Sequence, residues 1–244
     1  MKTHDTPSVS GAVFSFDVPA MSPDTYWAAV DAFHSFTPAF VDKGIYGYYE
    51  LGNQSWRIKP LLAPGKTLAE LTAVVAPMIA KFDELGVKYT SNITTHSTFL
   101  EGYEALFDPE TVGGNMLTSS RLILREHVEK NNSAITMAFR HGADQGYYFI
   151  GHLIAPGQFG GVSVETSVNP VWKKGLLLPL YNIFWNGTET REQQWAVIRN
   201  AIDNVGAVFK DVSPGSGTYI NEVCTAIPSF PLSPVLTDCK GESV

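Results

Sequence analysis

Long hydrophobic runs are absent from this sequence. Of its 244 residues, 44% are hydrophobic, but no stretch reaches the roughly 18 consecutive apolar residues that a bilayer-spanning helix needs. The longest apolar run, residues 175–181, is short and contains Pro179. The first residues, 1–7, also lack the apolar centre of a signal peptide. We therefore expect no membrane partner and, by default, a cytoplasmic location.

Positive charge and cysteine are scarce as well. The 17 Lys and Arg residues are outnumbered by 24 Asp and Glu residues, the net charge is −7, and no basic cluster occurs. This balance argues against nucleic acids and anionic membranes as partners. Two cysteines, Cys224 and Cys239, either form one bridge or stay free thiols, and their spacing does not decide between these states. Glycosylation sequons, which indicate at most that relatives are secreted, occur at Asn53, Asn92, Asn131 and Asn186.

The motifs of several common enzyme sites are missing. There is no G-x-S-x-G nucleophile elbow and no H-E-x-x-H zinc motif, and the six histidines show no metal-ligand spacing. Residues 65–67 resemble the end of a P-loop, but Pro60 stands where the earlier glycine is required. His152, between apolar residues of a predicted strand, is typical of a hydrogen-bonded core histidine rather than of a catalyst.

The N-terminal part of the chain predicts a strand followed by a helix. Residues 11–18 alternate as in a strand. Ser22 followed by Pro23 then predicts a helix start, with serine as the N-cap and proline in the first helical position. We expect this helix to end or kink at Thr37-Pro38, because proline removes an interior hydrogen bond.

A hairpin and a second helix are predicted next. Two strand-like runs, 45–51 and 55–62, flank a short polar loop. Thr67 and Glu70 have the spacing of a capping box, which opens a helix that precedes a strand over 87–95. The order β-α-β-β-α-β predicts an antiparallel sheet with helices packed on one face.

The rest of the chain predicts more strands of the same sheet. Residues 99–115 are expected to form an irregular connection with one helical turn. Thr190 and Gln193 form a second capping box that opens a late helix. Residues 223–244 are expected to be an extended tail, and the whole chain, 1–244, one α+β domain. The remaining strand-like runs are 120–124, 134–140, 147–154, 162–168, 176–185 and 217–222.

A stretch near the C-terminus combines a tight turn with polar residues. The turn at 213–217 leads into a short extended run in which alternation places Tyr219 and Asn221 on one face and Glu222 on the other. A tyrosine, an amide and a carboxylate on a stiff strand can be aimed at a ligand. An edge strand whose polar residues face water also explains the pattern.

Tyrosines in the first hairpin are a second candidate. Tyr46 and Tyr48 share one face of the predicted strand, and Tyr49 lies on the other. On an uncovered sheet face, tyrosines suit a flat, largely apolar or aromatic small molecule with a few oxygens. Alternatively, they pack beneath the helices.

Other polar or aromatic residues have simpler explanations. Arg57 and Lys59 share a face that we expect to be solvated. Trp172 follows a turn at 169–170 and is expected to be a core anchor. Arg121, at a predicted strand start, either forms an ion pair inside a cleft or reaches solvent.

Several segments resemble one family in the expected order. The segment Gly215-Ser-Gly-Thr-Tyr-Ile-Asn-Glu222 resembles the "G-x-Y-x-N-E/Y" strand of berberine-bridge-enzyme-like flavoproteins of fungal type, which are FAD-linked oxidoreductases of the vanillyl-alcohol oxidase and p-cresol methylhydroxylase superfamily. Ser119-Ser-Arg-Leu-Ile123 is similar to the family's "SSRLI" strand. Residues 168–173 resemble its "VNPxWR" segment, and 46–49 and 59–62 fit the first half of its substrate domain.

The resemblance implies that this chain is the substrate-binding domain of such an enzyme. In the family, the sheet of this domain covers a flavin held by a separate N-terminal domain, and the helices lie on the far face. The base that takes the substrate proton commonly lies on the "G-x-Y-x-N-E/Y" strand, and Glu222 matches it. Tyr219 and Asn221 match its neighbours, and Tyr46, Tyr48 and Arg121 are further substrate-binding candidates.

The sequence also departs from the family. Neither the FAD domain, with its flavin-tethering residues, nor the C-terminal return segment has a counterpart in the 244 residues. We therefore expect no FAD on this chain alone, and we expect a separate FAD-domain chain or self-association as partner. Three hypotheses follow: a truncated or split oxidoreductase of fungal secondary metabolism, a flavin-independent isomerase or cyclase that uses the inherited cleft, and a non-catalytic binding remnant.

Overall fold

The computed structural model describes residues 7–109, 116–155, 169–185 and 187–219. Within them, eight strands form one sheet in the order β4-β1-β3-β2-β7-β8-β5, and the short β6 pairs with β8. The pairings are antiparallel, so the predicted α+β architecture is confirmed. The strands are β1 (Val9–Phe16), β2 (Tyr46–Leu51), β3 (Trp56–Pro64), β4 (Tyr89–His96), β5 (Met116–Ser120), β6 (Ile123–Leu124), β7 (Tyr148–Leu153) and β8 (Gly175–Phe184).

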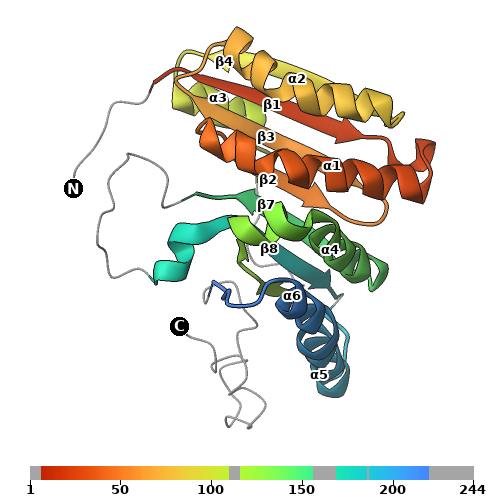
Figure 1. The fold of residues 1–244 in the computed structure, drawn as a ribbon. Helices are drawn as coiled ribbons and strands as arrows, with labels where there is room; N and C mark the ends of the chain where they lie inside the picture. The colour runs from red at the N-terminus through yellow and green to blue at the C-terminus, as the bar shows by residue number, and fades with distance from the viewer. Residues whose placement is uncertain (1–6, 110–115, 156–168, 186, 220–244) are drawn as a thin grey trace.

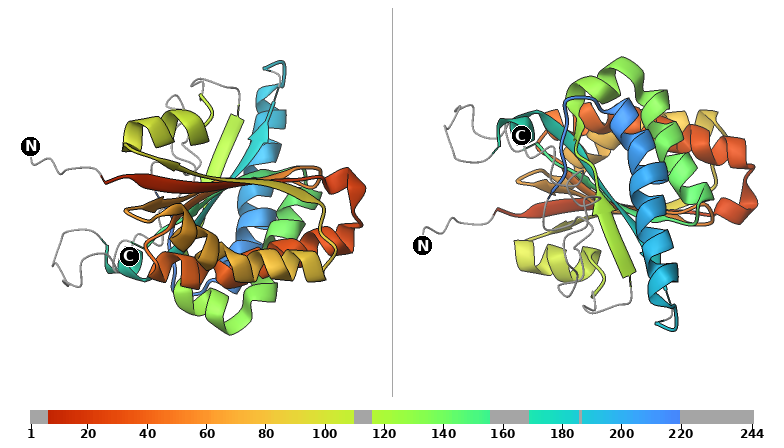
Figure 2. Two further views of the ribbon diagram at one scale, coloured as in Figure 1. Left: turned by 90° about the horizontal axis from the view of Figure 1, so that it is seen from above. Right: turned by 90° about the horizontal axis from the view of Figure 1, so that it is seen from below.

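Most of the helical structure covers one face of the sheet, and one short helix, α3, lies on the other (Figures 1 and 2). The α-helices are α1 (Pro23–Asp42), α2 (Leu68–Glu84), α3 (Phe99–Leu106), α4 (Arg125–Asp144), α5 (Arg191–Asn200) and α6 (Ala207–Val212). Three further segments are helical but not α-helical: the 3₁₀-helices η1 (Val18–Ala20) and η2 (Pro170–Lys174) and the π-helix η3 (Ala201–Gly206).

Helix α1 begins as predicted but does not end at its proline. The Ser22 hydroxyl accepts a hydrogen bond from the Thr25 N–H at 3.1 Å, which confirms the N-cap. Pro38 has no N–H for the carbonyl of His34, one turn earlier. The Thr37 hydroxyl donates to that same carbonyl at 2.6 Å. Because this side chain replaces the missing backbone donor, the helix continues to Asp42.

The predicted strand over 134–140 is wrong, because these residues belong to helix α4. Ile135, Ala138, Phe139 and Ala143 are buried at helical spacing, and a short apolar run of this kind also fits the alternation of a strand. The helix is interrupted at Asn131, whose backbone is non-helical and whose side-chain oxygen accepts a hydrogen bond from the Ala134 N–H at 3.3 Å. Asn131 therefore caps the second half of the helix from within it.

Helix α3 is longer than the single turn expected for residues 99–115, and it packs very closely on β1. A Cβ added to Gly11 would collide with Leu106, and one added to Gly102 would collide with Val9. These two glycines therefore allow the close approach of helix and strand. Together with Leu62, the side chains of Val9 and Leu106 form a small apolar cluster on this face of the sheet.

The main core lies between the sheet and helices α1, α2, α4 and α6, and it contains a polar chain. In β2, alternation directs Tyr49 into this core. Its hydroxyl lies 3.1 Å from Nε2 of His34, whose Nδ1 lies 3.4 Å from the Thr136 hydroxyl. Burial of His34 lowers its pKa to about 3, so the ring is neutral in the folded protein.

Some of the remaining predictions are confirmed, and others concern residues outside the described ranges. The capping boxes at Thr67 and Thr190 are confirmed. The terminal strand is described only to residue 219, and 217–219 lie outside the sheet ladders. The predicted strand 162–168, the tail 223–244 and both cysteines fall outside the described residues. In the part of the chain that the structure describes, no helix is long and apolar enough to cross a membrane.

We expect His34 to make folding sensitive to acid. The pKa of His34 is lower in the folded than in the unfolded state, so the unfolded state binds a proton first as the pH falls. The contribution of this histidine to stability is therefore complete above the unfolded pKa and is lost below it. With an unfolded value near 6.5, the free energy of unfolding should fall by about 2 kcal/mol between pH 7 and pH 5 from this group alone. Urea denaturation of the wild type and His34→Gln at both pH values measures it, and equal losses in the two proteins would contradict the assignment.

Candidate functional site

Of the helices in the described part of the chain, the short α3 is the one that lies on the second face of the sheet, opposite the main helical layer (Figure 2). Alternation places Tyr46, Tyr48 and Glu50 of β2 on the face opposite Tyr49, and all three are partly exposed. The paired strand β7 contributes Tyr148 and His152 to the same face. We call this surface the open face. The prediction that Tyr46 and Tyr48 share one side is confirmed, and they do not pack beneath α1.

His152 is at the centre of the polar groups on the open face. It pairs directly with Tyr48 in the β2–β7 register and is the diagonal neighbour of Tyr46. The Tyr46 hydroxyl lies 2.8 Å from His152 Nδ1. The ring of Tyr48 meets the imidazole edge-on, with centroids 5.2 Å apart. The expectation that His152 is a core histidine is therefore wrong, because its side chain is only partly buried; His34 of helix α1 is a buried histidine that packs against the sheet.

Two further groups of charged and phenolic residues occupy the open face. Tyr148 donates a 2.9 Å hydrogen bond to the Glu50 carboxylate. Burial, followed by the charge of Glu50, raises the Tyr148 pKa well above its ordinary value. Arg57 and Lys59 both form ion pairs with Asp108, and the side chain of Lys59 is only 13% exposed. The second strand of the hairpin is therefore not the simple solvated face that we expected.

A row of aromatic rings leads from helix α3 to His152. Phe99 stacks on Tyr103 at 6.4 Å, and Tyr103 stacks on Phe107 at 5.1 Å between centroids. Phe107 then meets Tyr48 edge-on at 6.2 Å. Phe99 and Tyr103 are 43% and 50% exposed, so much of this aromatic surface faces outward.

An apolar cavity adjoins Tyr46. Its volume is about 390 Å³, a size in the range of small-molecule sites. The cavity lies where the α1–β2 turn, the end of β3, the end of β7 and η2 come together. The lining residues are Gly44, Ile45, Tyr46, Pro64, Leu153, Ile154, Ala155 and Trp172.

Trp172 connects the cavity to the C-terminal turn. It is half-buried, so the expected core anchor is instead a lining residue of the cavity. Its ring meets Tyr219 edge-on, with centroids 5.6 Å apart and planes at 90°. The structure therefore brings two sequence-predicted residues, Tyr46 and Tyr219, to one region through a tryptophan that the sequence did not assign to a site.

Several hydrogen bonds fix the turn that precedes Tyr219. Arg121 is buried and donates from Nε to the Ser213 hydroxyl at 2.9 Å and from its terminal nitrogen to the Ser213 carbonyl at 2.8 Å. The Leu122 N–H donates to the Gly217 carbonyl at 2.8 Å. The Thr218 hydroxyl donates to the Ser120 carbonyl at 2.8 Å. Arg121 thus holds the turn, and a ligand-binding role for it stays a prediction.

Two predicted residues fall outside the described residues. Asn221 and Glu222 follow Tyr219 directly, and the roles given to them stay predictions. The sequence missed His152 and Trp172. The alternation that places His152 on the same face as Tyr148 was readable from the sequence, but its apolar neighbours favoured a core position. Nothing in the sequence indicated that Trp172 is only half-buried.

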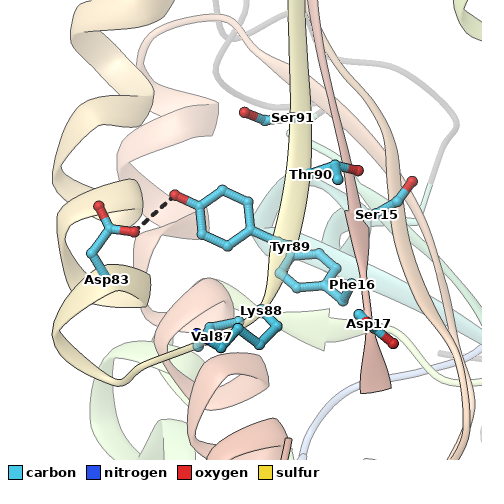
Figure 3. Close-up of a pocket in the computed structure, with 9 residues that line it drawn as sticks. All are labelled: Ser15, Phe16, Asp17, Asp83, Val87, Lys88, Tyr89, Thr90 and Ser91. Carbon is cyan, nitrogen blue, oxygen red and sulfur yellow. Dashed lines mark hydrogen bonds between the residues drawn. The ribbon is translucent and has the colours of Figure 1, made fainter. Parts of the chain in front are cut away.

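A second hollow, of about 600 Å³, lies at the other end of the sheet. Phe16 and Tyr89 line it, and they pair with each other at the C-terminal end of β1. Tyr46 lies near the other end of β1, because it pairs with Leu62, which in turn pairs with Gly11. In it, the Tyr89 hydroxyl donates to Asp83 at 3.0 Å (Figure 3). This hollow contains none of the sequence-predicted site residues. The Tyr46 end of the open face is therefore the better candidate.

Within the described ranges, no group of three or more His, Cys, Asp or Glu residues could hold a metal ion. The candidate site is instead a set of hydrogen-bonding phenol and imidazole groups near an apolar cavity. Such a site can orient an uncharged ligand and exchange a proton with its hydroxyl group.

Comparison with known proteins gives a consistent set of relatives, although no family model matches the chain. It is 27% identical over 225 residues to the FAD-linked oxidoreductase patO of Aspergillus clavatus, covering 91% of this chain and 39% of that protein. It is 24% identical to a VAO-type flavoprotein oxidase of Thermothelomyces thermophilus, with 91% and 39% covered. The chain thus spans about two fifths of the length of these curated relatives.

Solved structures show the same fold. A VAO-type flavoprotein from Myceliophthora thermophila superposes with a TM-score of 0.77 at 24% identity, over 91% of this chain and 41% of the other. The glucooligosaccharide oxidase of Acremonium strictum superposes with a TM-score of 0.66 at 12% identity, over 92% and 48%.

We expect Ser213→Ala to destabilise the protein by about 1–3 kcal/mol, because it removes the hydroxyl that receives the buried Arg121 Nε–H. The matched control is Ser91→Ala, at an exposed serine of β4, which should change the free energy of unfolding by less than about 0.5 kcal/mol. Chemical denaturation measures both, and equal small changes would show that the Arg121 contact does not hold the turn.

Proposed function

The homologues of this chain are FAD-linked oxidoreductases of the vanillyl-alcohol oxidase type, and from this we propose that it forms the substrate-binding part of such an enzyme. The observation that carries the proposal is the open face. Tyr46, Tyr48 and His152 lie together there, and Tyr46 is also one of the residues that line an apolar cavity. This face is also the side on which, in the resemblance, a flavin-bearing domain docks.

The described residues suit the substrate side of a flavin site and not the phosphates of FAD. Phosphates are commonly held by helix N-termini and by available cations. On the open face, Arg57 and Lys59 are already engaged by Asp108. When bound, the flavin would accept a hydride from the substrate carbon. We propose that it is held by polypeptide outside the 244 residues, either further sequence of a longer protein or a separate chain.

The surface around α3 supports a polypeptide partner on this side. Phe99, Leu100 and Tyr103 of α3 are 43%, 63% and 50% exposed. Large apolar side chains grouped in this way are typical of interaction surfaces. A flavin-bearing polypeptide that covered them would also close the open face and exclude water from the site. Self-association through the same surface is the alternative.

We propose a largely apolar or aromatic small molecule as substrate. The cavity beside Tyr46 is lined by aliphatic residues and Trp172, which favour apolar surface, while Tyr46 and His152 can bind one or two oxygens. One relative is named a bifunctional decalin synthase, from Penicillium decumbens. This name supports a role in natural-product metabolism.

If FAD is held elsewhere, the purified chain should remain colourless after mixing with FAD and gel filtration. The visible spectrum of the protein peak measures bound flavin directly. A yellow protein with one flavin per chain would contradict the proposal. Recovery of a yellow complex only when a flavoprotein chain co-purifies would favour the split enzyme.

Glu222 is the proposed base, and its amide variant tests the assignment. We expect Glu222→Gln in the producing organism to lower the product by at least about 100-fold, because an amide cannot accept the substrate proton. Glu84→Gln, at the exposed end of α2, is the matched control and should leave the metabolites unchanged. Unchanged metabolites in Glu222→Gln would exclude Glu222 as base for an oxidase and for a flavin-independent isomerase alike. Such a result together with a colourless, partnerless chain would favour the binding remnant.

A further inference from the structure

His127 occupies a capping position at the start of helix α4. It is the third residue of that helix, and its Nδ1 accepts a hydrogen bond from the Leu124 N–H at 3.2 Å. Glu70 in α2 and Gln193 in α5 occupy the same position, and their side-chain oxygens accept from the N-cap N–H at 2.8 and 2.7 Å. Leu124 has no polar side-chain atom, so the imidazole supplies the side-chain cap at this end of α4.

The other ring nitrogen of His127 holds the C-terminal turn. Nε2 lies 3.0 Å from the Pro214 carbonyl oxygen. A carbonyl accepts and a backbone N–H donates, so these two partners fix the tautomer, with the hydrogen on Nε2 and none on Nδ1. An imidazolium carries hydrogen on both nitrogens. Of the two charge states, the neutral one therefore makes both hydrogen bonds and the charged one does not.

The two segments that His127 joins are also bonded directly to each other. Residues 121–124 lead from β5 into α4, and the Leu122 N–H donates to the Gly217 carbonyl at 2.8 Å. The turn at 213–217 is therefore docked on this segment. His127 bonds to one partner through each ring nitrogen. A change in the charge of the imidazole must act on the contact between them.

The surroundings of His127 oppose a positive charge on the ring. The residue is 8% exposed and lies in the first turn of a 20-residue helix, at the positive end of the helix dipole. Burial lowers the pKa of His127 below its ordinary value. The Pro214 carbonyl and the charge of Glu126 act against this shift, and Arg121 and Lys130 add to it. The turn itself contains no ionisable side chain.

We propose that His127 is a positioning residue for the turn at 213–217, and that it releases this turn and the start of α4 when Nδ1 takes up a proton from water. The new N–H then points at the Leu124 N–H, so two donors face each other and the ring has to leave this position. The turn leads to Tyr219, whose ring meets Trp172 of the cavity lining. Acid should therefore loosen this side of the candidate site. The inference rests on the proposed function only for what the site does.

The experiment uses the full chain without flavin or substrate, from pH 7 down to the pH at which His127 becomes an imidazolium. Labelling of histidine with ¹⁵N reports which ring nitrogens carry hydrogen. Hydrogen exchange of the Leu124 amide measures the cap, and exchange of the Leu122 amide measures the bond to the turn, each as a protection factor relative to the unfolded chain. The nuclear Overhauser effect between the rings of Tyr219 and Trp172 follows the position of the chain after the turn.

For the wild type at pH 7, we expect hydrogen on Nε2 alone and protection of both amides. As Nδ1 becomes protonated, the protection factors of Leu122 and Leu124 should fall at least about fivefold, the effect of losing one buried hydrogen bond. The contact between the two rings should weaken in the same pH range. His127→Ala should show low protection of both amides at every pH.

His127→Gln is the conservative variant that separates capping from titration. Glutamine keeps an acceptor in the capping position, as Gln193 does in α5, but it does not titrate. Its protection factors at Leu122 and Leu124 should therefore change little with pH. His141→Gln is the matched control, because it removes an imidazole from the last turn of the same helix and should keep the pH dependence of the wild type.

Amides of the β1–β3 ladder report unfolding of the whole protein, to which His34 contributes in acid. Four results would overturn the proposal: hydrogen on Nδ1 of His127 at pH 7, constant protection in the wild type while the imidazole becomes charged, the same loss of protection in His127→Gln, or a loss that the β1–β3 ladder shares equally. Because no flavin, substrate or partner takes part, these results do not depend on the oxidoreductase assignment. A yellow chain, or unchanged metabolites in Glu222→Gln, would contradict the proposed function and leave this one standing.

Discussion

The antiparallel register of β2 against its neighbours is the constraint on which the rest of the structure depends. Successive residues of β2 point to opposite faces, so Tyr49 enters the core while Tyr46 and Tyr48 stay on the open face. A slip of one residue would exchange these sets, bury Tyr48 under α1 and expose Tyr49. Core packing against α1 therefore also determines which phenols a ligand can meet.

Two tyrosine–histidine pairs lie on opposite faces of the sheet, in opposite environments. Tyr49 and His34 lie inside the core, where burial keeps the imidazole neutral and the contact is structural. Tyr46 and His152 lie on the other face and are partly exposed, and Tyr46 is one of the residues that line a cavity. The functional groups are the same in both pairs. Burial makes the first pair a part of the core, whereas the second pair lies on the face that carries the candidate site.

The local signals in the sequence predicted much of the fold. The N-cap at Ser22, the capping boxes at Thr67 and Thr190 and the first hairpin depend on neighbours in sequence, and all are found. The strand predicted over 134–140 failed because a short apolar run fits both periods, and only packing against the sheet decides between them.

The candidate site was less predictable for the same reason. Tyr46, Tyr48 and Tyr219 were recognised from alternation and from the family resemblance. His152 was assigned to the core because its neighbours in sequence are apolar, yet in a strand those neighbours point to the other face. Trp172 and Arg121 depend on contacts with Tyr219 and Ser213, which are distant in sequence, so no local pattern could place them.

The hydroxyl of Thr37 has a consequence for how this sequence can change over time. It bonds the His34 carbonyl that Pro38 leaves without a backbone donor. The effect of losing Thr37 should therefore depend on which residue occupies position 38. With proline present, loss of the hydroxyl exposes a buried unpaired carbonyl; with an ordinary residue, the backbone supplies the bond itself. The two positions are thus coupled, and an evolutionary path that gains the proline is easier once the threonine is in place.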